Sequence, residues 1–165
     1  MEETANVTGA SSGMGREFVR QIAGKYPWLK EIWAIARRAE ELEKLKEEVG
    51  EVSIRPLSLD ISREKDREKL KELLAEEKPE ILFLVNAAGM GVQKKFACTS
   101  LFEAVSTTEL NCTALTAITS LCLPYCRERG RIFMLASAAA FVPQPGFAVY
   151  AASKAYVVSF SRALN

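Results

Sequence analysis

The sequence has no histidine among its 165 residues, and this absence excludes several kinds of site. Histidine is the commonest partner of cysteine in zinc sites, and it is the base of the usual Ser-His-Asp and Cys-His hydrolases. The chain therefore does not encode such a hydrolase in its usual form. Any proton chemistry has to use tyrosine, lysine, carboxylates or water.

Cysteine is scarce as well, with four residues and no paired C-x-x-C spacing. Cys122 and Cys126 could share a helix face, but two ligands do not make a metal site. We expect free thiols at Cys98, Cys112, Cys122 and Cys126, and no metal.

Long apolar runs and an excess of one charge are also missing. No run approaches the roughly 20 residues that a membrane span needs, and the acidic opening, Met1 to Glu3, is unlike a signal peptide. The net charge of +1 gives no signature of polyanion binding. We therefore expect a cytoplasmic protein with neither nucleic acid nor membrane as partner. With 48% apolar and 26% charged residues, the chain favours one globular domain with a substantial core.

What is present is an alternation of strand-like and helix-like segments. Strands are predicted at residues 4–7, 31–36, 52–57, 81–85 and 131–136, and helices from about residue 13, at 40–46, 63–77 and 107–127, and from about residue 149. The uninterrupted apolar segment 81–85 is typical of a parallel strand covered on both faces. This alternation predicts an α/β fold with a doubly wound parallel sheet of Rossmann type, in strand order 3-2-1-4-5. Pro124 is expected to kink the long helix, and Asn6 is an unexpected polar residue in the first strand.

A glycine-rich turn, TGASSGMG from Thr8 to Gly15, joins the first strand to the first helix. Glycines let the backbone approach a pyrophosphate closely, and the helix that follows offers free N–H groups and the positive end of its dipole. The spacing is G-x-x-x-G-x-G rather than G-x-G-x-x-G. Such turns also occur without a ligand, so this one alone favours a nucleotide only modestly.

Near the other end of the chain, Tyr150 and Lys154 stand four residues apart in the run YAASK. Residues at i and i+4 share a helix face, and an ammonium beside a phenol favours the phenolate, which suits acid–base catalysis. The same spacing is common on amphipathic helices with no such role.

Taken together, these motifs resemble those of the short-chain dehydrogenase/reductase family in its common Rossmann-type form. They follow in family order and spacing over nearly the whole chain. The matching positions are the Thr8 to Gly15 turn, Asp60 after a strand, Asn86-Ala87-Ala88-Gly89 after residues 81–85, Asn111 in a helix, Ser137 thirteen residues before Tyr150, and Lys154.

The resemblance implies a catalytic set of Asn111, Ser137, Tyr150 and Lys154. Tyr150 would give a proton to a carbonyl oxygen, or accept one in reverse, and Lys154 would assist it and bond the nicotinamide ribose. Ser137 would orient the carbonyl, and Asn111 would hold a water between the lysine and solvent. The alternatives are a turn hydroxyl for Ser137 and, for Asn111, a helix side chain bonded to its own backbone.

The resemblance also implies NADP(H), preferred over NAD(H). NAD-preferring relatives carry an acidic residue at the end of the second strand, where this chain has Ala36 followed by Arg37 and Arg38. A guanidinium can hold the 2′-phosphate, and Arg37 is expected to be the main contact. The alternative is that both arginines are solvated residues at the start of the next helix, and it applies more to Arg38 than to Arg37. The implied cofactor-binding residues are Gly9, Ser11, Ser12, Gly13, Met14, Gly15, Arg37, Arg38, Asp60, Ile61, Asn86, Ala87, Ala88, Gly89, Tyr150 and Lys154.

Individual cofactor positions have structural alternatives. Asp60 resembles the family residue that contacts adenine, but it could instead cap the next helix. Asn86 and Gly89 match the Asn-Asn-Ala-Gly motif, whose second asparagine is Ala87 here. Thr8 is expected to tie the glycine turn to this segment by a hydrogen bond.

The substrate is less sharply indicated. Phe141, Val142 and Phe147 could line a pocket for an apolar or lipid-like ketone, or they could pack their loop onto the sheet. Lys94 and Lys95 could attract an anionic substrate or carrier, although a solvated loop is the simpler reading.

Residues 1–165 are therefore predicted to form a single NADP-binding domain, incomplete at its C-terminus because the family's later strands are absent. Two functions follow. One is an oxidoreductase that interconverts a ketone and a secondary alcohol, as a homodimer or homotetramer paired through the helices of Asn111 and Lys154. The other is a catalytically incomplete nucleotide-binding fragment or scaffold of the same fold.

Overall fold

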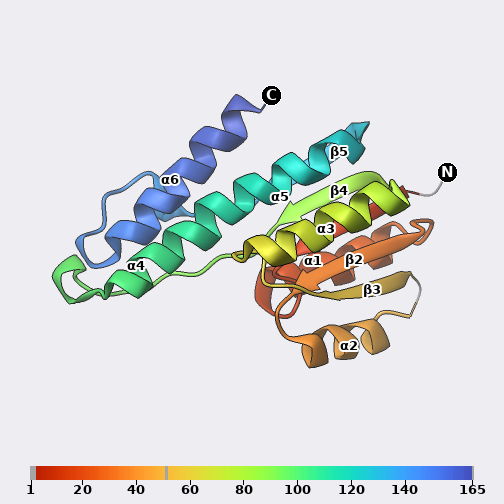
Figure 1. The fold of residues 1–165 in the computed structure, drawn as a ribbon, viewed down its shortest axis with the longest axis horizontal. Coiled ribbons are helices and arrows are strands. Elements are labelled where there is room, and N and C mark those ends of the chain that lie inside the picture. The colour runs from red at the N-terminus through yellow and green to blue at the C-terminus, as the bar shows by residue number, and fades with distance from the viewer. Residues whose placement is uncertain (1–2, 51, 165) are drawn as a thin grey trace.

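The computed structural model describes residues 3–50 and 52–164. Strands and helices alternate along the chain, as the sequence predicts (Figure 1). In order they are β1 (Glu3–Thr8), α1 (Gly13–Lys25), β2 (Glu31–Ala36), α2 (Ala39–Glu48), β3 (Ser53–Ser58), α3 (Glu64–Glu77), β4 (Glu80–Asn86), α4 (Leu101–Thr108), α5 (Leu115–Cys122), β5 (Cys126–Met134) and α6 (Ala148–Ala163).

The five strands form one parallel sheet in the order β3-β2-β1-β4-β5, which confirms the predicted topology. The order reverses beside β1, because β2 lies on one side of it and β4 on the other. Thr8 at the end of β1 pairs with Asn86 at the end of β4, so the loops after these strands leave the same edge of the sheet. Ligands of open α/β sheets bind at such a switch point.

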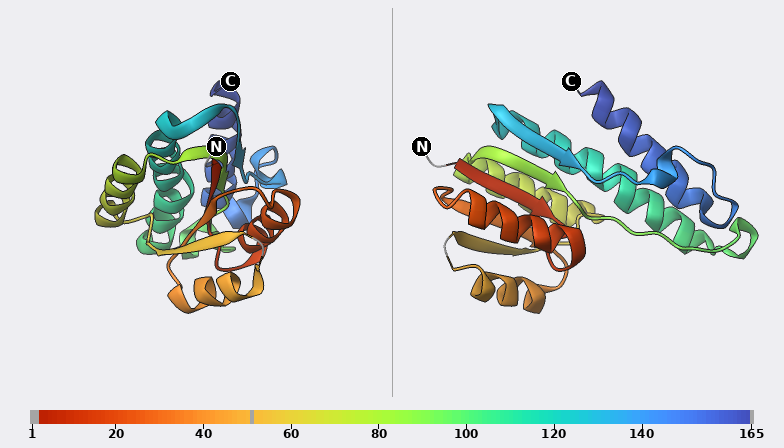
Figure 2. Two further views of the ribbon diagram at one scale, coloured as in Figure 1. Left: turned by 90° about the vertical axis from the view of Figure 1, so that its right-hand side faces the viewer. Right: turned by 180° about the vertical axis from the view of Figure 1, so that it is seen from behind.

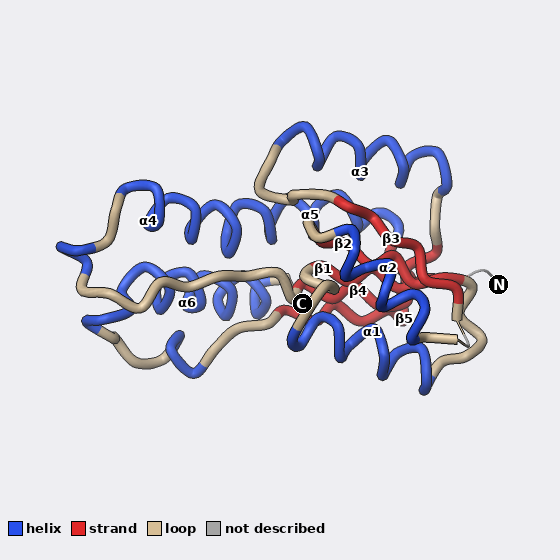
Figure 3. The backbone as a smooth tube through the Cα atoms, turned by 90° about the horizontal axis from the view of Figure 1, so that it is seen from below, coloured by secondary structure: helices blue, strands red, loops and turns tan. Residues whose placement is uncertain are grey.

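Helices cover both faces of the sheet, with α3 on one side of the strands and α1 on the other (Figures 2 and 3). Strand β2 shows why both faces are apolar. Ile32 and Ala34 belong to the core with α1 and α2, whereas Trp33 and Ile35 belong to the core with α3 and α5. Because neighbouring residues of a strand point to opposite faces, a wholly apolar strand serves two cores.

Helix α4 extends beyond the sheet, and α6 lies alongside it (Figure 1). A π-helical segment, Glu109–Ala114, joins α4 to α5. Strand β5 pairs only with β4, and so it forms an edge of the sheet in the described part of the chain.

The long helix differs from its predicted span of 107–127. It begins at Leu101, because Ser100 and Glu103 form a reciprocal capping box that fixes its first turn. The expected kink at Pro124 is wrong: the α-helix ends at Cys122, and Pro124 lies in a short 3-10 turn, Leu123–Tyr125. Proline lacks the N–H and clashes with the preceding turn, so here it ends the helix. Strand β5 accordingly begins at Cys126 rather than at residue 131.

Asn6, the polar residue in the first strand, lies fully buried against α5. Its Nδ2 donates to Sγ of Cys122 over 3.8 Å, while its Oδ1 has no partner among the described residues. Burial raises the pKa of the Cys122 thiol to about 12, so this cysteine is protonated at neutral pH. The contact between Asn6 and Cys122 is therefore part of the buried interior of the fold.

Candidate active site

The glycine turn between β1 and α1 makes two backbone approaches that leave no room for a side chain. Gly9 has a φ of +69°, and a Cβ built on it would lie 2.8 Å from the backbone nitrogen of Ala88. A Cβ on Gly15 would lie 2.3 Å from the carbonyl oxygen of Gly9. The turn therefore folds tightly on itself and on the loop after β4, and only glycine permits this.

Thr8 fastens this turn to the loop after β4, as the sequence predicts. Its Oγ1 donates to the carbonyl of Val85 over 3.3 Å, and it accepts from the backbone N–H groups of Ala87 and Ala88, each over 3.1 Å. The hydroxyl is buried and all its bonds are within the protein, so its role is structural.

A cleft of about 690 Å³ lies at this edge of the sheet. Most of the predicted cofactor residues line it: Gly9, Ser11, Ser12, Met14, Gly15, Arg37, Arg38, Asp60, Ile61, Ala87, Ala88 and Gly89. Four of them, Gly13, Asn86, Tyr150 and Lys154, do not line it. Phe102, Val105 and Ser106 of α4 complete the wall, and the motifs gave no indication of these three.

The amino end of α1 meets the cleft without a cap. Ser12 at the N-cap makes no side-chain capping bond, and the first turn contains no acidic residue. The first N–H groups of a helix have no partner within the helix, and they lie at the positive end of its dipole. This end of α1 is suited to an anion.

Arg38, rather than Arg37, contacts the glycine turn. Its Nη2 donates to Oγ of Ser12 over 2.7 Å and to Oγ of Ser11 over 3.0 Å. Arg37 is also on the cleft wall, and its backbone carbonyl accepts from Ser58 Oγ over 3.1 Å. Both arginines therefore line the cleft, and only the Arg38 guanidinium bonds the glycine turn.

Arg16 holds the same turn from α1, a contact that the sequence motifs did not reveal. Its Nη1 lies 3.5 Å from the carbonyl oxygen of Ser11 and 3.2 Å from the Glu41 carboxylate, and its Nη2 lies 2.5 Å from the Glu48 carboxylate. Arg16 therefore links the glycine turn to α2.

Asp60 lies on the cleft wall and does not cap the next helix. It lines the cleft, and its Oδ1 accepts from the backbone N–H and the hydroxyl of Ser62, over 3.1 and 2.6 Å. These bonds fix the turn before α3 rather than the helix itself, which begins at Glu64. Asn86, by contrast, is buried and donates to Thr119 Oγ1 over 3.0 Å, so it ties β4 to α5.

Lys154 is buried beside Tyr150 at the start of α6. Its Nζ donates to the carbonyl of Leu135 over 2.7 Å and lies 5.7 Å from the centroid of the Tyr150 ring. Burial lowers the pKa of the Lys154 ammonium from its ordinary value. A buried lysine that bonds a backbone carbonyl is held in one place, and it releases a proton more readily than a solvated one.

Asn111 stands in the π-helical segment between α4 and α5, and π-bulges are frequent at functional sites. Its Nδ2 donates to the carbonyl of Met90 and to Ser153 Oγ, over 2.8 and 2.9 Å, and its Oδ1 accepts from the backbone N–H of Met90 over 2.9 Å. The amide therefore does not bond its own helix. A Cβ on Gly89 would lie 3.2 Å from Asn111 Oδ1 and 3.4 Å from Lys154 Nζ, so both groups meet this glycine.

Ser137 follows β5 and lies two residues after Leu135, the carbonyl partner of Lys154. Its Oγ accepts from the backbone N–H of Ala139 over 3.2 Å, which caps the short 3-10 turn Ala138–Ala140. Of the four predicted catalytic residues, Lys154 lies beside Tyr150 and meets Gly89 together with Asn111, while Ser137 follows two residues after the carbonyl partner of Lys154. The sequence did not reveal the partners Leu135, Met90 and Ser153, because a backbone carbonyl or a neighbouring serine carries no motif.

Lys94, in the connection after β4, is paired with Glu103 of α4 over 2.6 Å. Lys94 and the bonds from Ser100 lower the pKa of Glu103 from 4.5 to about 2. The ionised carboxylate thus stabilises the fold above about pH 4.5, and this contribution is lost as the pH falls from there toward 2.

We expect Glu103→Gln to lower the melting temperature at pH 7, and this difference from the unmodified chain to shrink as the pH approaches 2. Thermal unfolding followed by circular dichroism over this pH range measures it. Glu43→Gln, on an exposed position of α2, is the matched control. A deficit that stayed constant down to pH 2 would contradict the pairing.

Within residues 3–50 and 52–164 no helix is long and apolar enough to cross a membrane. The same residues contain no cluster of three or more cysteine or carboxylate side chains placed to hold a metal ion.

Comparisons with known proteins agree with this geometry. A family model described as short chain dehydrogenase matches residues 3–165. The chain is 34% identical over 172 residues to the very-long-chain 3-oxoacyl-CoA reductase of Emericella nidulans, covering 98% of this chain and 48% of that protein. It is 34% identical over 168 residues to the NADP-dependent 3-hydroxy acid dehydrogenase of Schizosaccharomyces pombe, covering 99% of this chain and 64% of that protein.

Among solved structures, a short-chain dehydrogenase from Sphingobium yanoikuyae in complex with NADPH superposes with a TM-score of 0.87 at 28% identity. The alignment covers 99% of this chain and 64% of that chain. The fold is thus that of a Rossmann-type oxidoreductase. The chain belongs to the short-chain dehydrogenase family, and it spans about half the length of the Emericella relative.

Proposed function

We propose that this chain binds NADP(H) and interconverts a ketone and a secondary alcohol. The observation that carries the proposal is the placement of Lys154: it is buried next to Tyr150 and beside Gly89, a residue that lines the same cleft as the glycine turn. An acid–base pair beside a nucleotide cleft is what carbonyl reduction needs.

The residues of the cleft fit a dinucleotide. Gly9 and Gly15 keep the backbone bare where a pyrophosphate would approach, and the uncapped end of α1 offers N–H groups to its charge. Asp60 and Ile61 would hold the adenine end, and Gly89 would face the nicotinamide end. When bound, NADPH supplies the hydride.

The chain's own residues handle the proton. Tyr150 donates the proton of its hydroxyl to the carbonyl oxygen, and it takes a proton from the alcohol in the reverse direction. Ser137 orients that oxygen. Lys154, with its pKa lowered by burial and its Nζ 5.7 Å from the centroid of the Tyr150 ring, would pass a proton on. Asn111 fixes the neighbouring loop and would hold the water that leads to solvent.

The preference for NADP(H) is proposed from Arg37 and Arg38. Arg38 already holds the hydroxyls of Ser11 and Ser12, and Arg37 stands beside it on the same wall. Two arginines that line the cleft favour a 2′-phosphate over a hydroxyl. The solved relative with NADPH and the NADP-dependent relative of S. pombe support this choice.

Arg37→Ala and Arg38→Ala are each expected to weaken NADPH binding by roughly 10- to 100-fold, since a charge-assisted bond contributes about 1.5–3 kcal/mol. NADH binding should change little, so the affinity ratio falls. Fluorescence titration with both nucleotides measures this ratio. Arg129→Ala, at the amino end of β5, removes the same charge from the opposite end of the sheet and should leave the ratio unchanged. If neither cleft variant alters the ratio, the assignment fails.

The proposed substrate is an apolar or lipid-like carbonyl compound, in keeping with the names of the 3-oxoacyl-CoA and 3-hydroxy acid relatives. Phe141 and Val142 are 65% and 59% exposed, so their apolar surface is available at the loop before α6. Lys94 is engaged by Glu103, which leaves Lys95 as the better candidate to attract an anionic carrier.

A second candidate is a nucleotide-binding piece without turnover. It is favoured by one observation: neither Ser137 nor Tyr150 lines the cleft that the glycine turn lines. Titration with NADPH, followed by reduction assays with 3-oxoacyl thioesters and cyclic ketones, separates the two. Oxidation of NADPH that depends on a ketone supports the enzyme. Binding without oxidation supports the second candidate, and no binding at all contradicts both.

A further inference from the structure

The aromatic ring of Tyr150 is contacted by two residues outside the predicted catalytic set, Gly91 and Phe147. The rings of Phe147 and Tyr150 are stacked, with centroids 4.2 Å apart and an interplanar angle of 21°. A Cβ on Gly91 would lie 2.6 Å from Cδ2 of Tyr150 and 2.9 Å from Cζ of Phe147. Gly91 therefore lies against the edges of both stacked rings.

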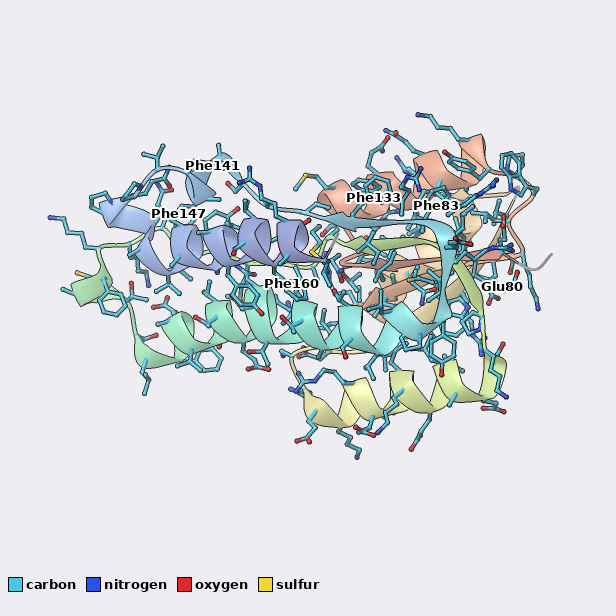
Figure 4. All side chains as sticks on the ribbon, turned by 90° about the horizontal axis from the view of Figure 1, so that it is seen from above. Glu80, Phe83, Phe133, Phe141, Phe147 and Phe160 are labelled. Atoms are coloured by element: carbon cyan, nitrogen blue, oxygen red, sulfur yellow. The ribbon has the colours of Figure 1, made fainter. Side chains whose placement is uncertain are left out.

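Phe147 is fixed by its backbone. It ends the short 3-10 turn Pro145–Phe147, its N–H donates to the carbonyl of Gln144 over 2.8 Å, and it is the N-cap of α6. Tyr150 follows in the first turn of the same helix, where a residue three positions on comes to the same side. Figure 4 shows Phe147 on the segment that leads into α6.

Gly91 cannot easily withdraw from the rings. The residue before it, Met90, is held at both its N–H and its carbonyl by the amide of Asn111, over 2.9 and 2.8 Å. Asn111 is itself 1% exposed and bonded to Ser153. Farther along the connection, Lys94 is paired with Glu103 of α4. A side chain at residue 91 would therefore displace the rings or break these bonds.

We propose that Gly91 and Phe147 are positioning residues for Tyr150. Phe147 sets the plane of the phenol, and Gly91, anchored through Met90 to Asn111, bounds its edge. Asn111 then acts on the tyrosine through the loop after β4. The inference rests on the proposed function, because a fixed phenol matters for proton transfer only if Tyr150 is the proton donor.

The test compares Gly91→Ala and Phe147→Leu with Gly24→Ala and Phe160→Leu. A Cβ on Gly24 of α1 meets nothing within 4 Å, and Phe160 stacks on another tyrosine of α6, Tyr156, with ring centroids 5.8 Å apart. Both controls therefore repeat the chemical change away from Tyr150, and Phe160 is labelled with Phe147 in Figure 4.

We expect Gly91→Ala and Phe147→Leu to lower kcat by roughly 10- to 100-fold, since a displacement near 1 Å can cost that much. The affinity for NADPH should stay within about twofold of the starting value. Phe147→Tyr keeps the ring and should restore most of kcat. Both control variants should retain the kcat of the unmodified chain. A kcat within twofold for both test variants, or a loss matched by lost NADPH binding, overturns the proposal.

Carbon-13 spectra of ring-labelled tyrosine give a readout without turnover, with the Tyr150 signal assigned by its loss in Tyr150→Phe. The signal should shift in Phe147→Leu and Gly91→Ala, and stay in place in the controls.

If the unmodified chain reduces no ketone, the proposed function fails, and the spectra alone decide the placement of the ring. An unmoved Tyr150 signal in Phe147→Leu overturns the stacking. If Gly91→Ala does not fold, Phe147→Leu still decides.

Discussion

Tyr150→Phe is expected to reduce ketone turnover by about 10²- to 10⁴-fold while NADPH binding stays nearly intact. The change removes one hydroxyl, and the ring that stacks on Phe147 remains. The chain has no histidine and Lys154 donates to the Leu135 carbonyl, so the Tyr150 hydroxyl is the group that we expect to give its proton to the substrate. Oxidation of NADPH at saturating ketone measures turnover, and fluorescence titration measures binding.

Tyr156→Phe is the matched control. Tyr156 is on the same helix, and its hydroxyl pairs with Thr116 Oγ1 of α5 over 2.7 Å, away from Lys154. Its loss should leave turnover unchanged. Turnover that survives in Tyr150→Phe would show that the proposed acid is wrong, whatever the binding result.

Gly15→Ala is expected to be the most damaging single change in the nucleotide cleft. The added Cβ would lie 2.3 Å from the carbonyl oxygen of Gly9 and 3.1 Å from that of Thr8, and both are backbone atoms. Helix α1 would have to move off the turn, at a cost of about 1–3 kcal/mol in the free energy of unfolding, typical of overpacking. NADPH binding should weaken at least about tenfold, because the uncapped end of α1 moves with it.

Urea unfolding and NADPH titration of this variant test both expectations. Gly24→Ala provides the control, because it lies in the same helix and a Cβ there meets nothing within 4 Å. It should stabilise the chain by about 0.5–1 kcal/mol and leave binding unchanged. Equal effects of the two substitutions would mean that the close approach at Gly15 does not matter.

The outline of the fold followed from short-range patterns. The segment 81–85 is an uninterrupted apolar run, the polar helix at residues 63–77 has a helical period, and the alternation of such segments permits few topologies. The glycine spacing from Gly9 to Gly15 and the Tyr150 to Lys154 spacing are equally local. Patterns of this kind are fixed by the geometry of the backbone, so they can be read without knowing what lies beside them.

The predicted ends of the long helix were wrong because particular side chains set them. The start of the long helix at Leu101 depends on the capping box of Ser100 and Glu103, and its end depends on whether Pro124 kinks or terminates it. Each outcome differs from its alternative by only a few kcal/mol at most. Periodicity does not resolve differences of that size.

The sequence by itself determined the order of the strands and the family, and it predicted which residues belong to the site at the carboxyl edge of the sheet. Only the tertiary structure decided their partners: that Arg38 rather than Arg37 contacts Ser11 and Ser12, and that Asn111 holds Met90 and so places Gly91 against Tyr150. The reason is physical. Motif spacing follows from the period of a helix or strand, whereas contacts across 20 to 60 residues depend on how loops close and how side chains fill the space between elements.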